Sequence, residues 1–72
     1  PLFYLIQGVA QNKLVKPDKA ILALETGLDY IIDDTKMKSD FYKQLSISYA
    51  LLNNTAKSKT FSDKAKQLEP TN

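Results

Sequence analysis

Acidic residues at helical spacing are the first candidates for a chemical role in this chain of 72 residues. Glu25, Asp29 and Asp33 recur at every fourth position, so a continuous helix would stack their carboxylates on one face. Stacked carboxylates could bind a divalent cation, but we prefer a solvated helix face with Lys36 and Lys38 nearby. The chain has no His and no Cys, which are common metal ligands, and His is also the usual general base. We expect no metal and no cofactor.

Hydroxyl groups are the remaining nucleophiles, and some lie close to a lysine in the sequence. Ser46, Ser48 and Ser58 would need a lysine as general base. Lys43 precedes Ser46 by three residues, however, and we expect it to point to solvent. Close packing of helices explains the small side chains of Ser46 and Ser58 better. Both glycines fall within helical segments rather than in a phosphate-binding loop. We therefore expect no enzymatic activity.

The charges are unevenly distributed around a net charge of +2. Residues 1–34 carry −2, whereas residues 35–72 carry +4. No arginine is present, although surfaces that bind nucleic acid usually use arginine for bidentate contacts. Lysines gather in residues 57–66, where we expect solvent or an acidic neighbour around them. We expect no nucleic-acid partner and no membrane insertion, since the longest apolar run, Leu2 to Ile6, is too short to span a bilayer.

Helices must position these groups, because the apolar residues follow helical spacing and no strand pattern competes. The predicted segments are Leu2 to about Lys16, Asp18 to Ile32, Thr35 or Ser39 to about Asn53, and Thr55 to about Leu68. Residues that end or cap helices separate them: Pro17 stops the first, and Asp34 is a capping candidate for the third. Asn53 tolerates the left-handed conformation that ends helices, and Thr55 is a candidate cap for the fourth.

The first two predicted helices resemble the last two at a spacing of 38 residues. The aligned pairs are Tyr4 with Tyr42, Gly8 with Ser46, Leu14 with Leu52, Ala20 with Ser58, and Gly27 with Ala65. A repeated helix pair is typical of solenoid proteins. We expect Gly8 and Ala20 to let the helices of the first pair approach closely, and Gly27 to lie where that pair meets the next. Glycine inside a helix costs about 1 kcal/mol relative to alanine, which favours a packing role.

These residues resemble the tetratricopeptide repeat family over nearly the whole chain. The second unit has the family's pattern of aromatic, leucine, small residue and tyrosine, then two small residues and a closing proline. The matching residues are Tyr42, Leu45, Ser46, Tyr49, Ser58, Ala65 and Pro70. The first unit matches at Tyr4, Gly8, Ala20 and Gly27. It differs in having glutamine where the family has leucine and tyrosine, and it lacks the closing proline. The chain is similar in particular to members from Bacteroidetes-type bacteria.

The resemblance implies an all-α fold in which two helix-turn-helix units, residues 1–34 and 35–72, stack as a short right-handed solenoid. It also implies that the first helix of each pair lines a concave face that binds other proteins. The residues expected to contact a partner there are Leu2, Leu5, Ile6, Val9, Lys43, Gln44 and Ile47. Leu5 and Val9 stand where members that clamp a carboxylate have Lys and Asn, so we do not expect that specialised function.

The first predicted helix has more apolar residues than one helix face can bury. The residues expected to pack on the second helix are Phe3, Tyr4, Ala10 and Leu14. The opposite flank, with Leu5, Ile6 and Val9, then needs cover from other protein, because leaving it in water would forgo several kcal/mol. The sequence therefore predicts a surface on this helix that associates with protein.

The prediction is a non-catalytic protein-interaction module whose partner is an apolar peptide, a helix or a second copy, including a homodimer of the isolated chain. One alternative is a purely structural role as inner repeats of a longer solenoid. Another is an accessory domain of an enzyme or regulator. The chain begins with Pro1 instead of Met, and we expect it to be a fragment of a longer protein. Its composition does not indicate a compartment.

Overall fold

The computed structural model describes residues 1–69, and these residues form four α-helices without a strand. The helices are α1 (Leu2–Lys13), α2 (Pro17–Leu28), α3 (Thr35–Leu51) and α4 (Thr55–Leu68). The predicted all-α class is confirmed. Pro70, the predicted end of the last helix, lies outside the described residues.

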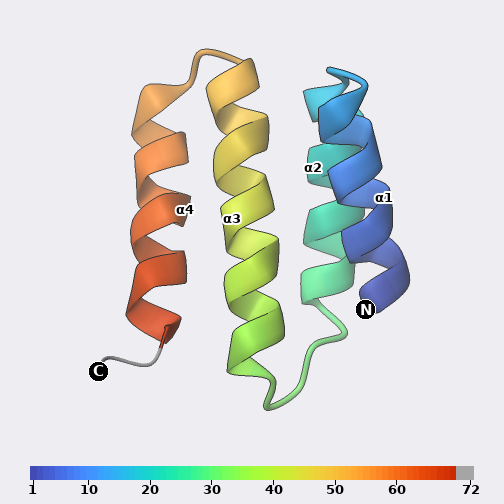
Figure 1. Ribbon diagram of the computed structural model, residues 1–72, viewed down its shortest axis with the longest axis vertical. Coiled ribbons are helices and arrows are strands. Elements are labelled where there is room, and N and C mark those ends of the chain that lie inside the picture. Colours follow the sequence, from blue (N-terminus) through green and yellow to red (C-terminus); the bar gives the residue numbers. More distant parts are fainter. Residues whose placement is uncertain (70–72) are drawn as a thin grey trace.

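The helices lie as two antiparallel pairs side by side, α1 with α2 and α3 with α4 (Figure 1). α3 packs against each of the other three helices, whereas α4 packs against α3 alone within residues 1–69. This arrangement makes α3 the element that joins the two pairs. The right-handed solenoid remains a prediction.

The core lies where the first pair meets α3. Its buried residues are Ala20, Leu24, Ile31, Phe41 and Leu45. Gly27 of α2 allows the approach, because a Cβ atom at this position would come within 2.5 Å of the Phe41 ring and 2.6 Å of the Tyr4 Cβ. Within the first pair, a Cβ at Gly8 would overlap the Leu24 side chain. Both glycines therefore stand at contacts that leave no room for a methyl group.

The turn after α1 satisfies the last carbonyls of the helix through a left-handed residue. The backbone N–H of Lys16 donates to the Gln11 carbonyl at 2.8 Å, and that of Val15 donates to the Asn12 carbonyl at 3.0 Å. This hydrogen-bond pattern ends helices when the residue after the cap has a positive φ, and Val15 has a φ of 56°. α1 thus ends at Lys13, three residues before the predicted Lys16.

The turn after α3 repeats this geometry at the equivalent positions. Asn53 has a φ of 60°, and the N–H of Asn54 donates to the Tyr49 carbonyl at 2.9 Å. Asparagine tolerates this conformation far better than the β-branched valine of the first turn. The side chain of Asn54 then accepts a hydrogen bond from Lys57 N at 3.1 Å and caps α4. The predicted cap Thr55 is instead the first residue of the helix.

α2 ends at Leu28, four residues before the predicted Ile32. The residues that follow keep two shorter-range backbone hydrogen bonds, from Tyr30 N–H to the Gly27 carbonyl at 3.0 Å and from Ile31 N–H to the Leu28 carbonyl at 3.2 Å, and they also pack on the rest of the fold. Ile31 is buried in the core, and the Tyr30 ring stacks on Tyr4 with 6.0 Å between centroids. The chain then turns and Asp34 caps α3, as the sequence suggests, by accepting a hydrogen bond at 2.9 Å from the backbone of the third residue of α3.

The apolar residues of α1 divide differently from the prediction. Three that we expected to pack on α2 are exposed, namely Phe3, Ala10 and Leu14. α1 instead presents Tyr4, Gly8 and Asn12 to the rest of the fold, at a spacing of four residues. Leu5, expected on the uncovered flank, is half-buried against the core. α1 is therefore rotated about its axis relative to the predicted orientation. This orientation follows from Gly8, which can approach Leu24 as no larger residue could.

Replacing Gly27 with alanine tests the close approach of α2 and α3. We expect Gly27→Ala to lower the free energy of unfolding by about 1–3 kcal/mol, because the new methyl group overlaps Phe41 and Tyr4. Helix propensity alone would raise it by about 1 kcal/mol. Urea denaturation measures the change, and Ala10→Gly at an exposed helical position gives the propensity difference by itself. A stabilised Gly27→Ala protein would contradict the contact.

Exchanging the two left-handed turn residues tests the strain at Val15. We expect Val15→Asn to raise the free energy of unfolding by about 1 kcal/mol, and Asn53→Val to lower it by about 1–2 kcal/mol. Val15→Thr keeps the β-branched side chain and should change it by less than about 0.5 kcal/mol. Chemical denaturation of the three variants provides the comparison. Effects of the same sign for Val15→Asn and Asn53→Val would refute the assignment.

Candidate functional site

An open apolar surface runs along α1 and α3. A hollow of about 360 Å³ is lined by Leu5, Ile6, Val9, Ala10 and Lys13. An adjoining hollow of about 200 Å³ is lined by Val9, Asn12, Lys13, Gln44, Ile47 and Leu51. The two share Val9 and Lys13, so we treat these lining residues together as the α1–α3 surface. Ile6 is 59% exposed and Ile47 is 45% exposed, which leaves large apolar side chains in contact with water.

A buried polar cluster lies beneath this surface and ties α1 to α3. The side-chain amide of Asn12 donates to the Gln44 carbonyl at 3.0 Å and to Gln44 Oε1 at 3.1 Å. Ser48 Oγ, which is fully buried, donates to Asn12 Oδ1 at 2.7 Å. Hydrogen bonds inside a protein have directional requirements that apolar contacts lack. The cluster therefore fixes the register of α1 on α3 and the shape of the surface above it.

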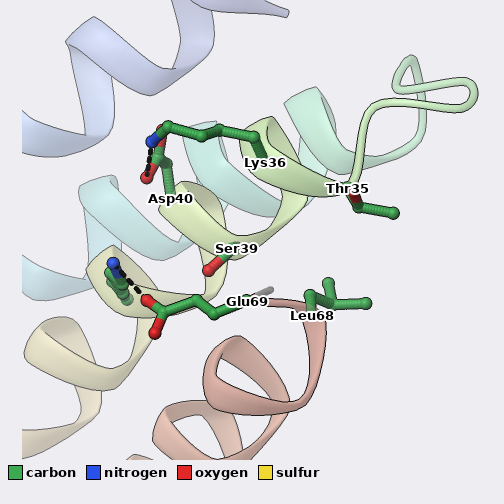
Figure 2. A pocket seen from close by; sticks show the side chains of 7 residues that line it. Thr35, Lys36, Ser39, Asp40, Leu68 and Glu69 are labelled. Atoms are coloured by element: carbon green, nitrogen blue, oxygen red, sulfur yellow. Dashed lines mark hydrogen bonds and ion pairs between the residues drawn. The ribbon is translucent and has the colours of Figure 1, made fainter. Parts of the chain in front are cut away.

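Five of the seven residues predicted to contact a partner line the α1–α3 surface: Leu5, Ile6, Val9, Gln44 and Ile47. Leu2 is exposed on α1 but lines neither hollow. Lys43 is not brought to this surface. Its ε-ammonium group lies 2.6 Å from the Glu69 carboxylate, at a separate hollow of about 180 Å³ between the ends of α3 and α4 (Figure 2).

The Lys43–Glu69 pair is electrostatically favourable in the fold. The hydrogen bond from Lys43 to Glu69, together with the attraction of opposite charges, raises the pKa of Lys43. The same interactions lower the pKa of Glu69 below its ordinary value. The lowered carboxyl pKa favours folding above the ordinary carboxyl pKa, and the raised ammonium pKa favours folding below the ordinary lysine pKa. Both groups are exposed, so the pair contributes little to stability.

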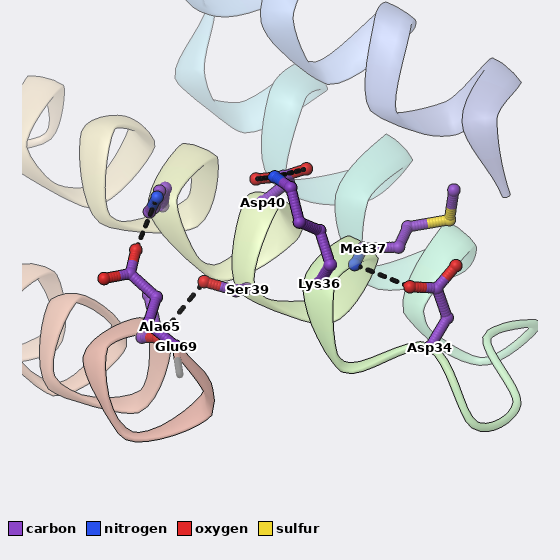
Figure 3. A network of polar contacts seen from close by, with 8 residues as sticks. Asp34, Lys36, Met37, Ser39, Asp40, Ala65 and Glu69 are labelled. Atoms are coloured by element: carbon purple, nitrogen blue, oxygen red, sulfur yellow. Dashed lines mark hydrogen bonds and ion pairs between the residues drawn. The ribbon is translucent and has the colours of Figure 1, made fainter. Parts of the chain in front are cut away.

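The small residues of the second unit lie where α3 crosses α4. Ser46 Oγ donates to the Ser58 carbonyl at 2.8 Å, and Ser58 Oγ donates to the Ser46 carbonyl at 2.9 Å. Farther along, Ser39 Oγ donates to the carbonyl of the buried Ala65 at 3.1 Å (Figure 3). These serines satisfy backbone carbonyls and pack two helices together, which accounts for them without a role in catalysis.

An aromatic cluster accounts for part of the lysine-rich helix. Phe61 of α4 packs between Tyr42 and Tyr49 of α3, with centroid distances of 5.9 Å and 5.5 Å. Lys57 Nζ lies 5.2 Å from the centre of the Tyr49 ring, and Lys64 Nζ lies 5.3 Å from that of Phe61. A lysine over an aromatic face gains a cation–π attraction while its ammonium group stays in water. The sequence interpretation missed these contacts because the spacing of lysines alone does not show which rings they cover.

The acidic residues do not form the stack that a continuous helix would have given. α2 ends at Leu28, so Asp29 is its cap residue and Asp33 lies beyond the helix, with a φ of 54°. Within residues 1–69, no group of three acidic or other metal-ligating side chains is placed to hold a metal ion. Among the same residues, no helix has the length and apolar character needed to cross a membrane.

Asn12 is the site residue whose role the sequence interpretation missed, because nothing in the sequence indicated that its side chain is buried and holds α1 on α3. We expect Asn12→Ala to lower the free energy of unfolding by about 1–3 kcal/mol, because the buried hydrogen bonds that Asn12 makes with Gln44 and Ser48 are lost. A double-mutant cycle with Ser48→Ala should give a coupling energy of about 0.5–3 kcal/mol. Gln7→Ala, on the exposed side of the same helix, should change stability by less than about 0.5 kcal/mol. Additive effects of Asn12→Ala and Ser48→Ala would contradict the coupling.

Comparisons with models of protein families, with curated proteins and with solved structures give no match to this chain. The tetratricopeptide resemblance therefore stays a prediction, carried by the residue pattern of the two helix pairs.

Proposed function

We propose that this chain is a non-catalytic protein-interaction module of the tetratricopeptide type. It binds an apolar peptide or helix, or a second copy of itself, on the α1–α3 surface. The observation that carries the proposal is the exposure of Ile6 and Ile47 at the two hollows of this surface. Exposed large apolar residues that gather in one concave area are typical of sites that bind protein.

Binding on this surface works by burial of apolar area on a pre-formed floor. Covering side chains such as Ile6, Val9 and Ile47 removes apolar area from water, at about 25 cal/mol per Å². Because the Asn12 cluster holds α1 on α3, the partner meets hollows that are already shaped, and little ordering of the module opposes binding.

Polar groups at the edge of the surface restrict how a partner lies. Lys13 lines both hollows and makes no ion pair within residues 1–69. It is the last residue of α1, where a positive charge complements the helix dipole. A partner that combines apolar side chains with a carboxylate or a backbone carbonyl near Lys13 satisfies the surface best. This suits an extended peptide or the side of an amphipathic helix.

Selection from a library of random peptides displayed on phage tests this function. We expect the selected peptides to be rich in apolar residues and to bind the chain with dissociation constants in the micromolar range or lower. Ile47→Glu places a charge in the second hollow and should weaken this binding at least tenfold. Circular dichroism should show unchanged helicity, because Ile47 is 45% exposed.

Ile32→Glu is the matched control, since Ile32 is 84% exposed and lies outside the α1–α3 surface. It should leave peptide binding unchanged. Sedimentation across a range of concentrations measures the oligomeric state of the unliganded chain. If the chain forms a dimer that Ile47→Glu dissociates and Ile32→Glu does not, the partner is a second copy. Peptides that bind the Ile47→Glu protein as well as the original chain would overturn the proposal, as would a monomer that selects no peptide.

A further inference from the structure

A hollow of about 390 Å³ lies between α1 and α2, apart from the α1–α3 surface. Its lining residues include Tyr4 and Gln11 of α1, and Lys19, Leu22 and Ala23 of α2. None of these residues lines the two hollows of the α1–α3 surface. A cavity of roughly 150 Å³ is enough to bind benzene, so this hollow has room for a larger ring system.

The internal repeat shows what occupies the corresponding place in the second helix pair. The aligned residues, 38 positions apart, are Tyr4 with Tyr42, Gln11 with Tyr49, and Ala23 with Phe61. In the second pair, the Phe61 ring packs between the two tyrosines and stacks on Tyr49 at an interplanar angle of 2°. The first pair keeps one tyrosine but has an alanine in the position of the phenylalanine. The hollow therefore corresponds to the place of a missing aromatic ring.

Gln11 adds an unsatisfied hydrogen-bond acceptor at this hollow. Its Oε1 atom is buried and has no hydrogen-bond partner within residues 1–69. A buried acceptor without a donor is unfavourable, because it has lost its hydrogen bonds with water. The terminal torsion of a glutamine side chain is soft, so the amide of Gln11 can turn toward a donor in the hollow that it lines. A ligand with an N–H or O–H group would satisfy this acceptor.

Lys19 supplies a positive charge at the edge of the hollow. It corresponds to Lys57, whose ammonium group lies 5.2 Å from the centre of the Tyr49 ring in the second pair. Lys19 takes part in none of the ion pairs formed within residues 1–69. An ammonium group is attracted to the face of an electron-rich ring, most strongly to the indole ring of tryptophan and also to phenol. The charge therefore favours the same class of ligand as the empty space does.

We propose that the hollow between α1 and α2 binds a planar aromatic ring that carries an N–H or O–H donor, such as an indole or a phenol. The ring lies beside Tyr4, in the place that Phe61 fills in the second pair, and donates a hydrogen bond to Gln11 Oε1. The same chemistry is found in a free small molecule and in a side chain of another protein. The proposal does not depend on binding at the α1–α3 surface.

Titration of the isotope-labelled chain with indole, followed by NMR, tests this site. We expect the amide signals of Ala23 and Thr26, which line the hollow, to shift with a dissociation constant in the millimolar range or lower. The ligand 1-methylindole has the same ring system without the N–H donor, and it should bind about threefold or more weakly because one hydrogen bond is lost. Gln11→Leu removes the acceptor and should make the two ligands bind equally. A Gln11→Leu protein that still prefers indole would overturn the proposal.

Ala23→Phe supplies the missing ring from the chain itself. It should abolish the shifts caused by indole, because the phenyl group takes the place of the ligand, and circular dichroism should show unchanged helicity. Ile32→Phe is the matched control, since it adds the same side chain at a position that is 84% exposed and outside the hollow. It should leave indole binding unchanged. Indole that binds the Ala23→Phe protein as tightly as the original chain, or that shifts no signal of the original chain, would refute the site.

N-acetyltryptophanamide carries the indole ring on a short peptide backbone and separates the two sources of the ring. Tighter binding than that of indole assigns the ring to a side chain of a partner protein, and weaker binding assigns it to a free small molecule. In both cases the site is supported, provided that Ala23→Phe abolishes the binding. Ile47→Glu, which disrupts the α1–α3 surface, should leave indole binding unchanged, so that failure of one proposal is distinguishable from failure of the other.

Discussion

The structure depends on the contact between the Phe41 ring and the backbone of Gly27. α3 joins the two helix pairs, and its ring reaches the first pair only because α2 has no side chain at that point. The packing of Leu24 and Leu45 follows from the same separation of α2 and α3. The hydrogen bonds between Asn12 and Ser48 follow from it as well, since they form only when α1 and α3 are this close. A small domain that has no cysteine to form a disulfide relies on such close packing, because its core is limited in size.

Periodicity and turn chemistry were sufficient to predict the helices and most of their ends. Asp34 and Asn53 act as predicted, because capping and left-handed turns depend on the residue itself and its nearest neighbours. The end of α2 was wrong for the opposite reason. Tyr30 and Ile31 continue the helical pattern in sequence, but contacts with Tyr4 and the core hold them in a different conformation. Local signals fail where distant residues compete for the same segment.

The candidate surface was predicted in part, and its limits have a physical explanation. Leu5, Ile6 and Val9 line a hollow of this surface. Their exposure could be predicted because an excess of apolar residues on one helix is visible in the sequence. The rotation of α1 about its axis was not visible, since it depends on the fit of Gly8 against Leu24. For the same reason, the sequence did not show that Asn12 is buried and Phe3 exposed. Lys43 faces Glu69 because α4 ends next to it. The spacing of residues within α3 could not predict this contact, since Glu69 belongs to a different segment.

The four helices differ in how many other helices they contact, and we expect them to differ in local stability for this reason. α4 packs on α3 alone within the described residues, whereas α3 also packs on α1 and α2. Fraying of α4 uncovers the tyrosines around Phe61 and releases the reciprocal serine bonds, but it leaves the junction at Gly27 intact. Opening can therefore proceed in steps from the carboxyl-terminal side, with the amides of α4 exchanging with solvent before those of α2 and α3.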